Sequence, residues 1–394
     1  MIDVLLVLLL PLVLMGQLLR FEPTMGVSLY PHDILIALIG MLVITSVEQR
    51  KLFLFIPIFI QKYWKYFLSW MIISLLIQVV LLAESPIIFL YLLRTSVYVT
   101  FLSWLFYYLR KADKRVILFY WMSGLLFAII TLGMYLALPD LRALKSLGWD
   151  DHYFRAVGPL LDPNFTGSIL VVTIISLIGF LGLNFHKHPM IRYGIAGLFG
   201  ITLAITFSRS SWLSLLIGMS LISIPVIIKL KIQFWRASII RLIVATLAIL
   251  LMTLIVIQKP GGEGVNVLRS TSIIARQQHD QSSLKTDPIR LLVGSGLSTS
   301  PDTKVSYHAR LPNNLGMLLL AFSGIPGIIL FIWSLLKTYT LFLVKYPHIL
   351  IPLATLLLLA QFNAVLTEPF TLLLCGFQLI SLTTEKTIIT QINV

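Results

Sequence analysis

Cysteine is nearly absent from this chain of 394 residues, because Cys375 is the only one and it lies within an apolar run. A single cysteine excludes an internal disulfide framework and a metal cluster built from cysteine thiolates. Charged residues are scarce as well, at 12% of the chain, whereas soluble globular domains carry about 25%. The sequence also shows no repeat of roughly 20 to 50 residues, which argues against a solenoid. These absences argue against an ordinary soluble domain.

Apolar residues dominate the chain, with 58% hydrophobic residues and a mean hydropathy of +0.94. This balance indicates a polytopic membrane protein. About twelve apolar segments approach the ~20 residues that a helix needs to cross a bilayer. They lie near 3–19, 34–47, 66–83, 86–109, 116–138, 165–183, 193–207, 210–228, 239–257, 315–336, 349–366 and 369–384. The sequence therefore predicts an all-α fold, in which 1–394 form one integral membrane domain with about twelve transmembrane helices.

The net charge of +14 is unevenly distributed along the chain. Lys and Arg gather in every second connection, as in the RKADKR stretch after the fourth segment, and are few in the short connections between. By the positive-inside rule, the basic connections and both termini lie in the cytoplasm. The charge thus sets the orientation in the lipid bilayer, and we expect no nucleic-acid partner.

The segment 258–312 is the longest polar stretch, and we expect it to form one long extracytoplasmic loop before the tenth helix. A chain that is mostly membrane helix has few places for aqueous chemistry, so this loop is the first candidate for a site. The loop and the residues directly after it carry Arg269, Arg276, His279, Arg290, His308, Arg310, Asn313 and Asn314.

Arg209 lies in a turn of only about three residues between the seventh and eighth segments, flanked by Ser208, Ser210 and Ser211. An arginine with hydroxyl groups at the start of a helix is a plausible anion site, because free backbone N–H groups and the helix dipole point there too. The alternative is a simple interfacial anchor.

Two further features concern helices. Arg94 lies inside the fourth segment, where an arginine is costly and therefore a functional candidate, although pairing with Glu84 or reaching out to the interface is the favoured interpretation. Asp162, Pro163 and Asn164 together are typical of a helix start with a capping side chain.

Asp150, Asp151 and His152 follow one another in the connection after the fifth segment. Carboxylates and imidazole suit a divalent cation, and one alternative is a metal-dependent transferase that uses one of these two aspartates. Three adjacent side chains do not easily face one ion, so a solvated turn is the favoured interpretation, and we expect no metal.

Four short motifs in order resemble the bacterial O-antigen ligase and O-antigen polymerase superfamily, over about 150–384. They are the Arg155–Asn164 stretch R-x-x-G-x-x-x-D-P-N, the Thr206–Ser211 stretch TFSRSS, Arg276 before Gly294-Ser-Gly296, and the Asn313–Gly327 stretch NNLGMLLLAFSGIPG. The resemblance implies a multi-pass protein of the bacterial cytoplasmic (inner) membrane with its site facing the periplasm.

The resemblance implies an inverting glycosyl transfer that needs no metal and no other cofactor. The donor is a glycan on undecaprenyl diphosphate, and the acceptor is another saccharide in a polymerase or lipid A-core in a ligase. Arg209 and Arg276 match the arginines that hold the diphosphate in the family, where bidentate guanidinium binding stabilises the leaving group. We assign Arg269, Ser208 and Ser210 to the same diphosphate site, and supporting roles to Arg155, Asn164 and Arg94.

The general base stays open in this sequence. Aligned on Gly324-Ile-Pro-Gly327, the His-Asn pair of the family becomes Asn313-Asn314, and an amide does not usefully accept a proton. The candidates for the base are His308, His279, Asp162 and Glu368. This departure places polymerase ahead of ligase, with a lipid-linked glycan transporter (flippase) as the alternative outside the enzymes. The sugars, their linkage and the oligomeric state stay open.

Overall fold

The computed structural model describes residues 2–24, 27–46, 64–82, 87–109, 114–147, 149, 152–184, 189–229, 243–244, 246–248, 251, 265, 274, 288–294, 312, 314–345, 347–363, 366 and 368–392. Within these ranges the chain is mostly helical, which confirms the expected all-α class. The α-helices are α1 (Ile2–Leu14), α2 (Pro31–Thr45), α4 (Lys65–Val80), α5 (Ile87–Leu109), α6 (Lys114–Ala137), α7 (Pro163–Asn184), α8 (Pro189–Ala204), α9 (Arg209–Lys229), α12 (Pro288–Val293), α13 (Leu315–Lys345), α14 (Pro347–Leu359) and α15 (Pro369–Ile392).

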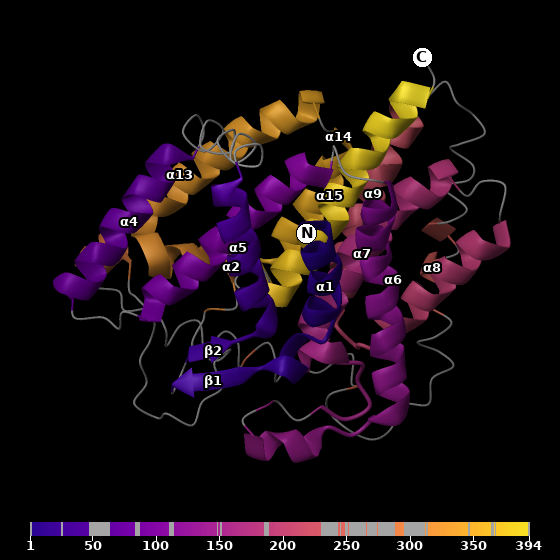
Figure 1. Cartoon of the computed structure of the whole chain (residues 1–394), viewed down its shortest axis with the longest axis horizontal. Helices are drawn as coiled ribbons and strands as arrows, with labels where there is room; N and C mark the ends of the chain where they lie inside the picture. The colour runs from indigo at the N-terminus through magenta and orange to yellow at the C-terminus, as the bar shows by residue number, and fades with distance from the viewer. Residues whose placement is uncertain are drawn as a thin grey trace.

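Short elements join the helices at one end of the bundle. Three 3-10 helices, η1 (Gly16–Leu19), η2 (Arg142–Leu147) and η3 (Gly158–Leu160), lie in the connections after α1 and α6. The strands β1 (Phe21–Thr24) and β2 (Val27–Leu29) form an antiparallel hairpin. In Figure 1 this hairpin lies at the lower edge of the bundle, and the C-terminal end of α15 lies at the top.

Helix α15 runs through the middle of the bundle, where it packs against α5, α6, α7 and α14 (Figure 1). Its buried face includes Phe370, Leu373, Leu374 and Phe377. A second group is formed by α13, which packs along α4 and against the short helix α12. The central position of α15 therefore places the turn before it, which contains Glu368, among several other helix ends.

The starts of several helices agree with local capping chemistry. Asp162 Oδ1 accepts hydrogen bonds from the backbone N–H groups of Asn164 (2.6 Å) and Phe165 (3.1 Å), which confirms the predicted cap of α7. Asn314 Oδ1 accepts in the same way from Gly316 N (2.7 Å) at the start of α13. These short side chains satisfy backbone donors that a helix start leaves unpaired.

The first helix is shorter than the apolar pattern suggests. We expected a span over 3–19, but α1 ends at Leu14 and a 3-10 turn follows. The cause is Gly16, which has a left-handed backbone (φ 55°) and approaches the backbone of another segment so closely that a Cβ there would lie 2.7 Å from Pro159 O. Glycine alone tolerates both conditions.

Part of the long loop before α13 packs between helices. The expected extracytoplasmic loop spans 258–312, yet α12 lies against α4 and α13. The carbonyl of Val293 at the end of α12 accepts hydrogen bonds from Ser74 and Gln78 of α4, and Gln78 Nε2 also donates to Phe322 O at 3.0 Å. Part of the expected loop is thus helical and packed, because α4 supplies hydrogen-bond partners for its backbone, while the side of the membrane on which it lies stays a prediction. The rest of this loop lies largely outside the described residues.

Gly324 marks a non-helical point inside α13, with φ 64° and ψ −171°. This region of backbone space is used almost only by glycine. A Cβ at this position would also overlap the carbonyl groups of Leu291 and Leu292 at the end of α12. The break in α13 is therefore what allows α12 to pack against it.

Replacing Gly324 with alanine is expected to destabilise the fold by about 1–3 kcal/mol from backbone strain alone, with the overlap adding to this. The matched control is Gly133→Ala, because Gly133 lies in helix α6 and a Cβ there has no atom within 4 Å. Thermal unfolding of both variants in detergent measures the difference. Equal midpoints for the two variants would contradict the close packing of α12.

Within the described residues, one helical stretch, Leu315–Thr338, is both long and apolar enough to cross a membrane. Shorter apolar helical stretches are found in Ile2–Leu14, Pro31–Thr45, Lys65–Val80, Met122–Ala137, Pro163–Ser176, Tyr193–Ala204 and Pro369–Ile380. The number of membrane crossings therefore stays a prediction, and the expected ninth span (239–257) lies mostly outside the described residues.

Candidate functional site

A group of polar side chains joins the start of α7 to the start of α9. Ser208 Oγ donates to Asn164 Oδ1 at 3.2 Å and lies 2.9 Å from Ser211 Oγ and 3.3 Å from Ser210 Oγ. Asn363, in the turn after α14, donates through Nδ2 to Ser210 Oγ at 3.2 Å. We refer to Asn164, Ser208, Ser210, Ser211 and Asn363 as the polar cluster.

The start of α13 lies beside the same turn after α14. Leu315 N donates to Ala360 O at 2.8 Å, and Asn314 Nδ2 donates to Gln361 O at 3.0 Å. The starts of α7, α9 and α13 therefore join, through the turn after α14, into one hydrogen-bonded assembly. Because each helix start carries a partial positive charge, such a convergence favours an anion.

Arg209 is the first residue of α9, lies between two serines of the polar cluster and is partly exposed. A cation at a helix start opposes the helix dipole, at a cost of roughly 0.3–1 kcal/mol. The guanidinium group thus stands at one of the helix starts that this assembly joins. The expected short turn before α9 is confirmed, because α8 ends at Ala204.

The buried side chain of Arg155 supports this turn by hydrogen bonds to its backbone. Its Nε donates to Thr206 O at 3.0 Å, and its Nη2 donates to Phe207 O at 3.5 Å. The neighbouring backbone adds a bond from Ala156 N to Ile205 O at 2.9 Å. Phe207 has a left-handed backbone (φ 50°), so this turn needs outside support. Arg155 thus shapes the turn that presents Arg209.

Glu368 is the buried carboxyl group next to this assembly, with 3% of its surface exposed. It lies in the turn before α15, where Oε2 accepts from Thr371 N at 2.5 Å and Oε1 lies 3.5 Å from Gln17 Nε2. The pKa of Glu368 is raised to about 7: burial raises it most, the Thr371 N–H lowers it, and the negative charge of Asp162 adds to the rise. Such a group changes its protonation state near neutral pH, as a general base requires.

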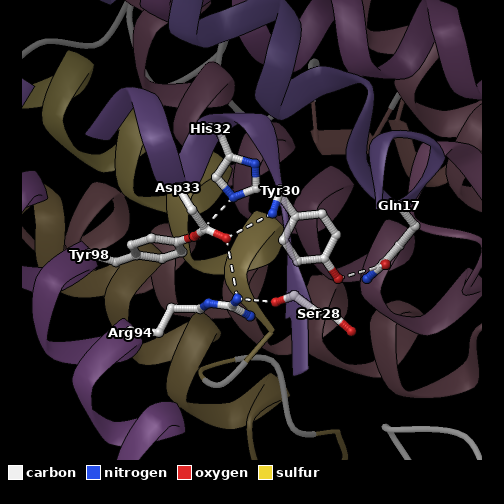
Figure 2. Close-up of polar contacts among 7 residues, drawn as sticks. All are labelled: Gln17, Ser28, Tyr30, His32, Asp33, Arg94 and Tyr98. Atoms are coloured by element: carbon white, nitrogen blue, oxygen red, sulfur yellow. Dashed lines mark hydrogen bonds and ion pairs between the residues drawn. The ribbon is translucent and has the colours of Figure 1, made fainter. Parts of the chain in front are cut away.

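Arg94 lies in a different polar group, which Figure 2 shows. Its Nη2 is 3.2 Å from Asp33 Oδ2, and it also donates to Ser28 O. The partner that the structure reveals is thus Asp33 at the start of α2. The sequence alternatives were pairing with Glu84, which lies outside the described residues, or reaching out to the interface; with 17% of its side chain exposed, Arg94 is instead mostly buried beside Asp33.

The structure brings together a part of the expected site and adds residues to it. Ser208, Arg209, Ser210 and Asn164 lie together. Arg155 holds the backbone of the turn before Arg209, and Asn314 bonds to the turn after α14. The positions of Arg269, Arg276, His279, His308, Arg310, Asn313, Asp150 and Asp151 lie outside the described residues. The sequence analysis did not identify Asn363, Gln17 or Tyr30. Their only signal is that each interrupts or borders an apolar segment.

Among the residues that the structure describes, no three His, Cys, Asp or Glu side chains group closely enough to hold a metal ion. Comparison with models of protein families, with curated proteins and with solved structures returns no match.

Proposed function

We propose that this chain is a membrane-embedded glycosyltransferase of the O-antigen polymerase type, which acts at the outer face of the bacterial cytoplasmic membrane. It transfers a glycan from undecaprenyl diphosphate to a saccharide acceptor. The observation that carries the proposal is Arg209, partly exposed at a helix start among hydroxyl and amide groups that come from three separate segments.

The chemistry of the transfer fits this arrangement. When the acceptor hydroxyl displaces the diphosphate, negative charge develops on the leaving group, which therefore needs electrostatic stabilisation. A guanidinium group binds diphosphate oxygens bidentately, and the N–H groups of helix starts add to this without moving. Arg276 and Arg269 of the long loop are proposed to complete the diphosphate site.

The expected topology supports the proposal in one respect. The turns at 139–164, 208–209 and 367–368 are all expected on the outer face. Residues of these turns lie near one another, as the hydrogen bond from Ser208 to Asn164 and the electrostatic interaction of Asp162 with Glu368 indicate. In a bundle of about twelve spans with both termini in the cytoplasm, this end faces the lipid-linked donor.

The acceptor separates polymerase from ligase. A polymerase extends another lipid-linked repeat, whereas a ligase passes the glycan to lipid A-core. The absence of the family histidine at Asn313 keeps polymerase ahead.

The test is a transfer assay with purified protein and lipid-linked donor, run with each acceptor, with and without EDTA. Lengthened lipid-linked glycan that is insensitive to EDTA is expected. Product only with lipid A-core would favour the ligase, loss with EDTA would favour the metal-dependent transferase, and translocation without transfer would favour the transporter.

Cysteine labelling tests the orientation of the chain. In a Cys375→Ala background, Ser146→Cys in η2 and Ser282→Cys in the long loop are expected to react with an impermeant maleimide in intact cells. Ser146 is exposed, so its reaction reports membrane side and not burial. Lys337→Cys is the matched control, since it is exposed on α13 and expected on the cytoplasmic side. Labelling of the two serine positions only after lysis would reject the orientation and the mechanism with it.

A further inference from the structure

The carboxylate of Asp33 organises the buried polar group in Figure 2. It accepts hydrogen bonds from Tyr30 N at 3.0 Å, from the Tyr98 hydroxyl and from the Arg94 guanidinium. Since an ionised carboxylate only accepts, the single hydroxyl hydrogen of Tyr98 points to Asp33. His32 Nε2, 2.8 Å from the same hydroxyl oxygen, must therefore be the protonated nitrogen of its ring. The donors of this group thus all point toward the Asp33 carboxylate, His32 through the Tyr98 hydroxyl.

The side chain of Tyr30 lies between this group and α15. Its ring stacks on His32 (centroids 5.3 Å apart, planes at 18°) and meets Phe370 edge-on (4.7 Å, 77°). Packing on these rings fixes where the phenol points, and its hydroxyl donates to Gln17 Oε1 at 2.8 Å. The Gln17 amide must then present its NH₂ group on the other side, where Glu368 Oε1 lies 3.5 Å away.

Both oxygens of Glu368 consequently face donors, namely Gln17 Nε2 and Thr371 N. Such surroundings orient the group as an acceptor, whereas its burial opposes the charged form, and the balance brings its pKa to about 7. Glu368 lies between the end of α14 and the start of α15, close enough to Asp162 of the α7 cap for the two carboxyl groups to interact.

We propose that Glu368 accepts the proton of the acceptor hydroxyl, and that Gln17 and Tyr30 are positioning residues that set its readiness to do so. This inference rests on the proposed glycosyl transfer. The acceptor oxygen forms the new bond to the anomeric carbon, the bond from that carbon to the diphosphate oxygen breaks, and the diphosphate leaves with the electron pair. The hydroxyl proton passes to Glu368, directly or through one water.

The charge of Glu368 also depends on the other polar groups near it. Asp162 opposes its ionisation by like charge, and Cys375, about two turns along α15, is buried. On the α2 and α5 side, Arg94 and Asp33 form an ion pair, and Tyr98 and His32 bond to each other. The pKa of Glu368 is therefore set first by its burial, and then by the donors from Thr371 and Gln17 and by the charge of Asp162.

The pH dependence of transfer follows from the raised pKa of Glu368. Below pH 7 the Glu368 carboxyl is protonated and accepts no further proton, and above pH 7 it is a carboxylate. Transfer is therefore expected to rise with pH and to level off above about pH 7. Glu368→Gln is expected to lower the transfer rate by roughly 10²–10⁴ and to remove this acid limb, while its amide oxygen still caps α15.

Two variants separate positioning from catalysis. Tyr30→Phe keeps the stacked ring and removes the hydroxyl donor to Gln17, and Gln17→Met removes the donor to Glu368 at similar size. Losing one such hydrogen bond is expected to move the acid limb up by roughly half a pH unit, with little change in the plateau rate. An unmoved acid limb in both variants would overturn the positioning roles.

Infrared difference spectra of the wild-type protein minus Glu368→Gln follow the Glu368 carboxyl band without any transfer. We expect a midpoint near pH 7 that rises in Tyr30→Phe and Gln17→Met. A midpoint near the ordinary glutamate pKa would overturn the proposed readiness of Glu368 to accept a proton near neutral pH.

Full activity of Glu368→Gln, or equal losses in Glu368→Gln and His308→Ala with no change in pH profile, would overturn Glu368 as the base. Absence of transfer by the wild-type protein, with the infrared midpoint as expected, would instead reject the proposed function alone.

Discussion

Replacing Arg209 with alanine is expected to lower glycan transfer by roughly 10²–10⁴, with the protein still folded and inserted. Two charge-assisted hydrogen bonds to the diphosphate, each worth on the order of 1.5–3 kcal/mol, account for this range. Lysine at the same position is expected to restore little, because a point charge does not replace a bidentate fork. Initial rates with purified lipid-linked donor measure the loss, and Arg276→Ala is expected to behave in the same way.

The matched control for Arg209 is Arg142→Ala. Arg142 is an exposed arginine paired with Asp140 (2.6 Å), in η2 and outside the polar cluster. It is expected to retain full transfer, which separates a local diphosphate site from a general loss of positive charge. Near-normal rates in both Arg209→Ala and Arg276→Ala would remove the diphosphate site, whereas equal losses in Arg142→Ala would point to non-specific attraction.

Replacing Arg94 with methionine is expected to destabilise the folded protein by about 3 kcal/mol or more. The guanidinium and the Asp33 carboxylate are both mostly buried, with 17% and 15% of their side chains exposed. Removing one partner leaves the other charge in surroundings that solvate it poorly, which typically costs about 3–5 kcal/mol. The midpoint of thermal unfolding in detergent, followed by tryptophan fluorescence, measures the change.

The double variant Arg94→Met with Asp33→Asn identifies the cause. Asparagine at position 33 keeps an oxygen for the N–H of Tyr30 but carries no charge, so most of the lost stability is expected to return. The surface control Arg142→Met breaks an exposed pair and is expected to change stability by about 1 kcal/mol at most. A double variant no more stable than Arg94→Met alone would show that packing, and not the unpaired carboxylate, causes the loss.

The expected helix positions could be read from the sequence because they depend on neighbouring residues. Apolar segments bounded by polar turns predicted α4, α5, α6, α7 and α9 to within a few residues of their observed ends. Asp162 as the cap of α7 and the short turn before Arg209 follow from side-chain chemistry acting over two or three residues. The early end of α1 was missed because its cause, the approach of Pro159 to Gly16, comes from a distant segment.

The partners of the polar side chains were decided only by the tertiary structure. Glu368 meets Gln17 from 351 positions away, Asn363 meets Ser210 from 153 positions away, and Arg94 meets Asp33 from 61 positions away. A helix that is apolar all round carries no stripe that indicates which face meets which neighbour, so periodicity could not pair these segments. The sequence by itself determined the helical class, the turns and the types of side chain available at them. Packing around α15 decided which of those side chains meet, because only the assembled bundle brings the separate turns to one end.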